Sequence, residues 1–152
     1  MPESTLEKPY TRWRDPYFLA TLLIGSLLRG VGYQFPQRQI FDEVYYLSAA
    51  EDYLACQPDA NSVHPPLAKI QMALIEAFAD GLSGGAVLER TYVWRLPSLL
   101  FGILILVWTH RFAWAITRHR WITNLTTALV AIDFLAIVQS RVAMLDQIQA
   151  FW

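Results

Sequence analysis

Two adjacent carboxylates, Asp42 and Glu43, have the residue type and the spacing to do acid–base chemistry. They begin a predicted helix over residues 41–55, which is rich in aromatic residues and alanine and contains no Gly or Pro. A carboxylate at the edge of an apolar region can acquire a raised pKa and act as a general base. The same pair could instead hold a metal ion or an arginine, and Asp42 could simply cap the helix.

A histidine and a lysine form a second candidate group in the stretch His-Pro-Pro-Leu-Ala-Lys, in which His64 comes first and Lys69 last. Proline is favoured at the first position of a helix, so this stretch predicts a helix over residues 67–79. The rigid corner could place a phosphate between the imidazole and the ammonium group. A plain loop-to-helix junction with a solvated lysine explains the same pattern.

Arginines stand at the ends of two later apolar segments. Arg95 precedes one segment, where it pairs with Asp42 or Glu43, binds a phosphate through its planar guanidinium, or extends to a membrane interface. Arg141 and Asp146 follow the end of the other segment, where they either contribute to a binding site or form a structural ion pair with each other.

The long segments next to these residues are apolar. Three segments, residues 16–35, 96–116 and 121–139, are long enough to cross a bilayer, which requires roughly 17–25 residues. The chain is 55% hydrophobic and only 16% charged, whereas about a quarter of the residues of soluble proteins are charged. We therefore predict an all-α, polytopic transmembrane protein with three or so spans and an extracytoplasmic loop that contains short interfacial helices. A net charge of −1 gives no argument for a nucleic-acid partner.

Basic residues predict how the spans are oriented. They gather before the first span and at the turn between the second and the third, and the positive-inside rule places both groups in the cytoplasm. The protein is then a multi-pass protein of the inner (plasma) membrane with a cytoplasmic N-terminus. The predicted segments between the spans are a cytoplasmic tail at 1–15, an extracytoplasmic loop at 36–95, a cytoplasmic turn at 117–120, and an extracytoplasmic turn with the start of the next membrane helix at 140–152.

Three residues are unusual for their predicted surroundings. Asp133 lies inside the third span, where a charge is costly, and we expect it to pack between helices. Arg29, near the end of the first span, either extends to the interface or faces protein. Cys56 is the only cysteine, so the chain has no internal disulfide or Cys-based zinc site, and we expect this thiol to be small and buried.

The predicted orientation brings the polar candidates to one face of the membrane. Acids, a histidine and several cations at an apolar boundary suit an amphipathic substrate with a charged phosphate head. A polyprenyl-phosphate sugar is such a molecule. The residues that share this face are Asp42, Glu43, His64, Lys69, Arg95, Arg141 and Asp146.

Four stretches of the chain, in this order, carry a resemblance: FDEVYYLSAAEDYL, VHPPLAK, RLPSLLFGIL and QSRVAMLD. Together they resemble the start of the protein O-mannosyltransferase family, which are integral-membrane glycosyltransferases of the GT-C type. The resemblance runs from residue 39 to the end of the chain. It implies an inverting transfer of mannose from a polyprenyl-phosphate mannose donor to Ser or Thr hydroxyls of an acceptor polypeptide at the extracytoplasmic face. It implies no metal and no cofactor beyond the lipid-linked donor, which is a substrate.

The resemblance also implies roles for individual residues. Asp42 would be the catalytic base, Glu43 would position the acceptor or the loop, and His64 would shape the same site. Arg95 would be needed for structure or for donor binding.

Near the end of the chain, Arg141 and Asp146 match a family stretch beside the donor pocket. With Lys69, they complete the predicted substrate-binding residues.

Two other interpretations stay open. The chain also resembles transferases of the same superfamily that move aminoarabinose or other sugars to lipid A, although those carry Lys-Pro-Pro-Leu where this chain has His64 and the residues that follow. A non-catalytic membrane subunit or a transporter fragment is the alternative from another class, and a dimeric state is left open. Members of the O-mannosyltransferase family have many more spans, so we expect an N-terminal part of a longer protein, inactive by itself.

Overall fold

The computed structural model describes residues 12–59, 61–83 and 91–152. Within these ranges the chain forms a short 3-10 helix and seven α-helices and contains no strand, so the predicted all-helical fold is confirmed. The elements are η1 (Arg12–Arg14), α1 (Pro16–Gly30), α2 (Glu43–Leu54), α3 (Pro66–Ser83), α4 (Thr91–Thr117), α5 (Arg120–Ala131), α6 (Phe134–Ser140) and α7 (Asp146–Phe151).

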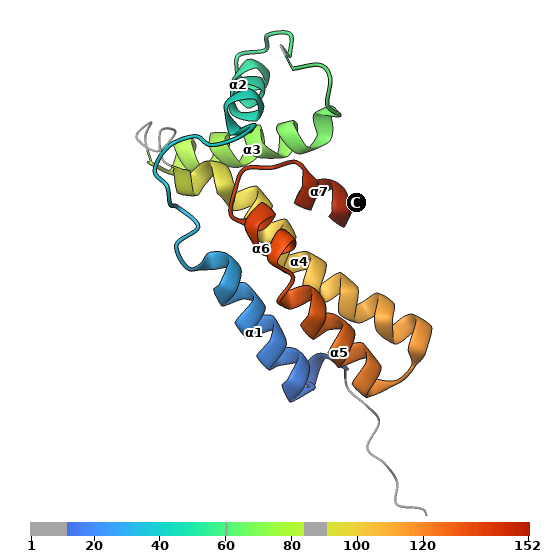
Figure 1. The fold of residues 1–152 in the computed structure, drawn as a ribbon. Helices are drawn as coiled ribbons and strands as arrows, with labels where there is room; N and C mark the ends of the chain where they lie inside the picture. The colour runs from blue at the N-terminus through green and yellow to red at the C-terminus, as the bar shows by residue number, and fades with distance from the viewer. Residues whose placement is uncertain (1–11, 60, 84–90) are drawn as a thin grey trace, which may run out of the picture.

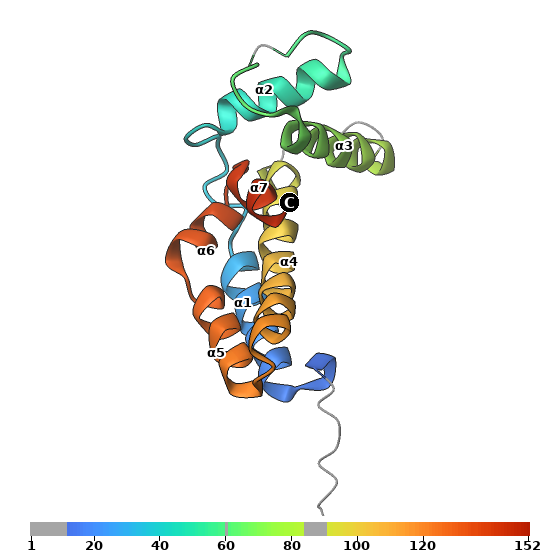
Figure 2. The same cartoon turned by 90° about the vertical axis from the view of Figure 1, so that its right-hand side faces the viewer.

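The helices form an elongated bundle with a cap at one end. Helices α1, α4, α5 and α6 run along the bundle, and α2 and α3 lie across its upper end in Figure 1. Figure 2 shows the short helix α7 beside α4, directly below this cap. The opposite end of the bundle holds the start of α1 and the turn between α4 and α5, so the cap and this turn lie at opposite ends of α4.

Two parts of the bundle have the composition of a membrane span. The segment Val93–Thr117 of α4 is apolar and long enough to cross a bilayer by itself. Helices α5 and α6 reach the required length only together, and they are bent by 57° at the break between them. Helix α1 is apolar but has only 15 residues. The described part of the chain therefore contains one candidate span, or two if the bent pair counts as one.

The break between α5 and α6 is stabilised by polar side chains. Arg29 is fully buried and donates hydrogen bonds to the carbonyl oxygens of Val130 and Ala131, at 3.1 Å and 2.9 Å, where the helical ladder of α5 ends. Arg29 therefore faces protein. The prediction that Asp133 packs between helices is wrong, because its side chain is exposed and caps α6 by accepting a hydrogen bond from the Ala136 N–H at 2.7 Å.

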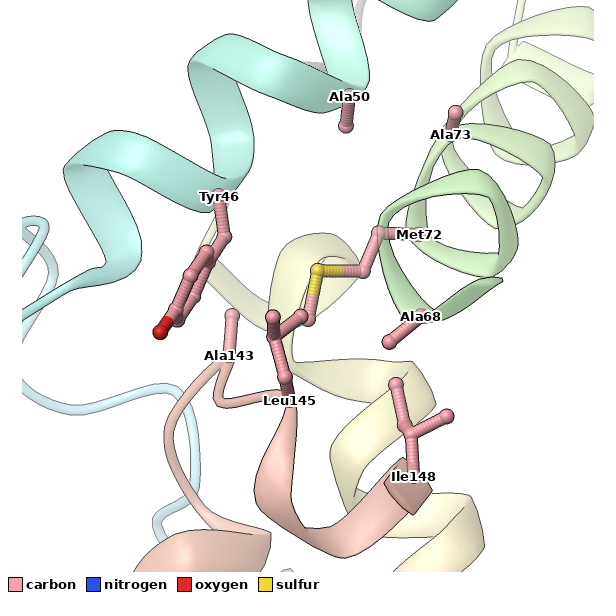
Figure 3. Close-up of a cluster of buried hydrophobic side chains, with 8 residues drawn as sticks. All are labelled: Tyr46, Ala50, Ala68, Met72, Ala73, Ala143, Leu145 and Ile148. Carbon is pink, nitrogen blue, oxygen red and sulfur yellow. The ribbon is translucent and has the colours of Figure 1, made fainter. Parts of the chain in front are cut away.

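The cap is attached to the bundle by a small apolar cluster, drawn in Figure 3. Small alanines on both helices let α2 and α3 approach closely, and the segment before α7 closes the cluster from below. Its buried members are Tyr46, Ala50, Ala68, Met72, Ala73, Ala143, Leu145 and Ile148. This cluster sets the position of α2, and with it the position of the acidic pair at the start of that helix.

Two local expectations are corrected in the cap. Helix α3 runs from Pro66 to Ser83 rather than over residues 67–79, because Gly81 lowers helix propensity by only about 1 kcal/mol and does not end the helix. Cys56 is exposed rather than buried, since it lies just after α2 in a turn with a positive φ of 54°.

Candidate active site

Glu43 and Arg95 form a buried ion pair where the cap meets the bundle. Both side chains are fully buried, and Arg95 contacts Glu43 through two parallel hydrogen bonds, from Nε to Oε1 at 2.7 Å and from Nη2 to Oε2 at 2.9 Å. The predicted pairing of Arg95 with one of the two acids is thus realised with Glu43. The planar fork of an arginine matches a carboxylate in this way.

The remaining hydrogen-bonding capacity of this pair is also used. Glu43 accepts further bonds from the N–H groups of Ile40, at 2.9 Å, and Ala143, at 2.7 Å. The other three N–H groups of Arg95 donate, each at 3.1 Å, to three carbonyl oxygens of the segment between α1 and α2. These oxygens belong to Tyr33, Pro36 and Arg38. The pair therefore joins three distant segments, and all five guanidinium N–H groups are used within the protein.

Asp42, one residue earlier, has the opposite environment. It stands at the N-cap position of α2, but its backbone is in the α region and its side chain makes no capping hydrogen bond. A capping side chain normally needs an extended backbone, which explains why the cap is missing. The preceding Phe41 has a positive φ of 52°, a costly conformation for a bulky residue. The Asp42 carboxylate is exposed, and the interpretation as a helix cap does not describe it.

Asp42 lines an open hollow of about 260 Å³ beside α2. The same hollow contains Tyr45 and Tyr46 from α2, and Asn61, Val63 and His64 from the loop before α3. The His64 ring stands almost perpendicular to the Tyr46 ring, at an interplanar angle of 83° and a centroid distance of 5.4 Å. The structure thus brings Asp42 and His64, which are distant in sequence, to one site.

Lys69 lies behind this hollow rather than in it. Its ammonium group is fully buried, forms an ion pair with Asp59, and donates a hydrogen bond to the Asn61 carbonyl oxygen at 2.6 Å. Asp59 also accepts hydrogen bonds from the Tyr53 hydroxyl at 2.9 Å and the Asn61 N–H at 2.7 Å. The hydrogen bond from Lys69 is the main cause that holds the pKa of Asp59 below its ordinary value. Lys69 therefore shapes the loop that carries Asn61 and does not point at His64 with a free ammonium group.

Asp146 and Arg141 are placed separately. Asp146 is exposed at the start of α7 and close enough to Tyr46 for its charge to act on the phenol, as the charge of Asp42 also does. Arg141 donates a hydrogen bond to the Val31 carbonyl oxygen at 2.9 Å. In the part of the chain that the structure describes, Arg141 and Asp146 do not form the ion pair that the sequence left open.

Arg141 borders a second hollow, of about 490 Å³, on the side of α1. Its other lining residues are all apolar and come from the last two turns of α1 and the residue that follows them, namely Ile24, Leu27, Leu28 and Val31. A guanidinium at the edge of an apolar surface matches a molecule with an anionic head and a hydrocarbon tail.

Sequence reasoning missed Tyr46, Asn61 and Asp59. Tyr46 lies on the same helical face as Asp42, four residues earlier. That spacing could have identified Tyr46 as a site residue. No local signal identifies Asp59 as the partner of Lys69, because the contact depends on how the loop folds back. No group of three or more His, Cys, Asp or Glu side chains that could hold a metal ion occurs among residues 12–59, 61–83 and 91–152.

The arrangement can support transfer to a hydroxyl group. An exposed carboxylate can accept a proton from a hydroxyl that lies within hydrogen-bond reach, and a histidine and tyrosines next to it can bind polar substrate groups. The buried pair next to it keeps the backbone at the carboxylate in place.

Comparison with known proteins assigns the chain to a family. Residues 19–152 match the family model described as dolichyl-phosphate-mannose-protein mannosyltransferase. Neither a curated protein nor a solved structure matches the chain. The family match covers nearly all of the chain, including every candidate residue described above. The chain therefore belongs to the dolichyl-phosphate-mannose-protein mannosyltransferase family, whose members are membrane-bound glycosyltransferases.

Proposed function

We propose that the protein transfers mannose from dolichyl-phosphate mannose to Ser and Thr hydroxyls of acceptor polypeptides on the extracytoplasmic side of the membrane, with Asp42 as the catalytic base. The observation that carries this proposal is the open environment of Asp42. It is an exposed carboxylate without a capping hydrogen bond, in a hollow that also contains His64. Family membership implies the donor and the protein acceptor.

The proposed step is a single displacement with inversion. Asp42 takes the proton from the acceptor hydroxyl while the hydroxyl oxygen forms a bond to C1 of mannose. The bond between C1 and the phosphate oxygen breaks, and its electron pair leaves with dolichyl phosphate. This step needs a carboxylate that the acceptor hydroxyl can reach, which the exposure of Asp42 supports.

Glu43 and Arg95 would act through position rather than by contact with substrate. Their ion pair connects the start of α2 to α4, and Glu43 also binds the Ala143 N–H. Both groups are fully buried and hydrogen bonded. We assign to this pair the task of holding the backbone on which Asp42 stands, and Lys69 has a similar task for the loop of Asn61 and His64.

Arg141 would bind the phosphate of the donor. Its apolar neighbours on α1 would contact the first part of the lipid chain, so this hollow would receive the donor from the membrane. Asp146 is close enough to Tyr46 for its charge to act on the phenol, and we assign it to the wall of the sugar site.

The predicted topology belongs to the same proposal. The cap of α2 and α3, within residues 36–95, and the segment 140–152 would lie outside the cytoplasm, while residues 1–15 and the turn at 117–120 would lie inside. Arg111 and Arg120, at the end of the bundle away from the cap, contact aromatic rings, as expected at a cytoplasmic membrane interface.

The test is Asp42→Asn in the complete gene product, assayed in isolated membranes with dolichyl-phosphate mannose and a Ser/Thr-containing peptide. We expect transfer to fall by a factor of at least about 100, which is the usual contribution of a general base. The amount of protein in the membrane should stay unchanged. Turnover at the wild-type rate would reject Asp42 as the base, and transfer of the sugar to a lipid instead of the peptide would favour the lipid-modifying alternative.

A further inference from the structure

Tyr46 joins the apolar cluster to the polar hollow. Only 4% of the residue is exposed, and its ring packs in the cluster with Met72 and Ala143. In Figure 3 its hydroxyl group points away from Met72 and Ile148, toward the margin of the cluster. Tyrosine suits such a boundary because its ring is apolar and its tip is polar. The cluster therefore fixes the ring and directs the hydroxyl outward.

The Tyr46 hydroxyl makes no hydrogen bond to any residue in the described ranges 12–59, 61–83 and 91–152. The residue lines the same hollow as Asp42 and His64, and its ring is held against the imidazole in an edge-to-face contact. Although the ring is buried, the hydroxyl oxygen is not enclosed by protein and is open to the hollow. A rigidly held donor without a protein acceptor, at the wall of an open hollow, indicates a partner in the ligand.

The charges around the phenol select the kind of ligand atom. Burial raises the pKa of Tyr46, and the carboxylates of Asp42 and Asp146 raise it further. The phenol therefore keeps its proton at neutral pH and can donate it in a hydrogen bond. The same two carboxylates repel an anion, so a phosphate oxygen is disfavoured at this position. An uncharged hydroxyl oxygen is favoured.

We infer that Tyr46 is a substrate-binding residue, whose hydroxyl donates a hydrogen bond to an uncharged hydroxyl oxygen of the substrate held beside Asp42. The inference rests on the proposed function. That oxygen belongs either to the mannose of the donor or to the acceptor side chain, and the phosphate of the donor binds elsewhere.

The first experiment is Tyr46→Phe in the complete gene product, with kcat and KM measured for dolichyl-phosphate mannose and for a Ser/Thr peptide. The ring and its packing remain, so the thermal stability should not change. We expect kcat/KM, per folded protein, to fall about tenfold, the effect of one lost hydrogen bond. Tyr17→Phe is the matched control, because Tyr17 is exposed at the opposite end of the bundle, and it should keep the wild-type kcat/KM.

A second experiment identifies the oxygen. Donors that lack one mannose hydroxyl are compared in the wild type and in Tyr46→Phe. If the bond goes to mannose, one deoxy donor and Tyr46→Phe will each cause the loss, and the two together will cause no further loss. If it goes to the acceptor, all losses will add, and only the KM for the peptide will rise.

The outcomes separate this inference from the proposed function. A Tyr46→Phe protein with kcat/KM within twofold of wild type overturns the inference, even if Asp42→Asn is inactive. A loss that disappears when kcat/KM is normalised to folded protein overturns it as well. Full activity of Asp42→Asn overturns the proposed function itself.

Discussion

Asp42 and Glu43 are neighbours in the chain and carry the same chemical group, yet they belong to two different regions. The Glu43 carboxylate is closed to substrate, because its oxygens already accept hydrogen bonds from Arg95 and from the N–H groups of Ile40 and Ala143. The Asp42 carboxylate is open and lines a hollow. A carboxylate that is surrounded by donors stabilises a fold, whereas a carboxylate that faces a hollow can accept a proton from a substrate.

The difference also shows how the two regions depend on each other. Glu43 connects α2 to α4 and to the segment before α7, so it fixes the first turn of α2. Asp42 stands on that turn. An accessible base needs a rigid backbone, and here the rigidity comes from the adjacent residue. Substitutions in these two regions should therefore differ in how they affect stability and activity.

Arg95→Met tests the role of the buried Glu43–Arg95 ion pair. The substitution leaves Glu43 buried without its counterion and removes the donors to three backbone carbonyls. We expect the free energy of unfolding to fall by about 3–5 kcal/mol, as for other broken buried ion pairs. Denaturant unfolding in detergent micelles measures this loss. Asp42→Asn is the control and should lose activity but not stability, so equal destabilisation by both substitutions would remove the contrast.

Glu76 on α3 differs from both carboxylates: it is buried like Glu43, but its Oε1 has no hydrogen-bond partner among the residues that the structure describes. Burial, with Glu51 nearby, raises the pKa of Glu76 from its ordinary 4.5 to about 7. The unfolded chain therefore releases this proton at a lower pH than the folded chain does. As a result, Glu76 lowers stability progressively as the pH rises from 4.5 to about 7, and its full cost is present above that.

Glu76→Gln should remove this cost. At pH 8 we expect the variant to be more stable than the wild type by about 3 kcal/mol, since one pKa unit corresponds to about 1.4 kcal/mol. At about pH 4 the two proteins should be equally stable, because both side chains are then neutral in both states. Unfolding measured at both pH values checks this. A stability difference that does not depend on pH would show that Glu76 is not titrating in this range.

Lys69→Met tests the loop side of the hollow. The substitution leaves Asp59 without its ion pair and the Asn61 carbonyl oxygen without its donor. Asp59 is partly exposed and can be hydrated, so we expect a loss of about 2 kcal/mol, less than for Arg95→Met. Thermal unfolding measures the loss. Arg14→Met, which removes an exposed cation, should change stability by less than about 0.5 kcal/mol.

Much of the architecture could be predicted from the sequence because it depends on local patterns. The apolar run that corresponds to α4 is long enough for a membrane span to be predicted from it directly. The two prolines after His64 predict the start of α3. The break in the third apolar segment, between α5 and α6, could not be predicted in the same way. Its break depends on Arg29, a residue of α1 about a hundred positions earlier, which satisfies the carbonyl groups that the break leaves free.

The family, and the placement of an acid pair, a histidine and several cations at the boundaries of apolar helices, follow from the order of the residues alone. Which of the two acids is accessible depends on the packing of the helices. Successive residues at the start of a helix point about 100° apart, so Asp42 and Glu43 face different surroundings. Glu43 is closed by Arg95 and Ala143, which lie 52 and 100 positions away. Such long-range contacts depend on how the helices pack, and no local pattern encodes them.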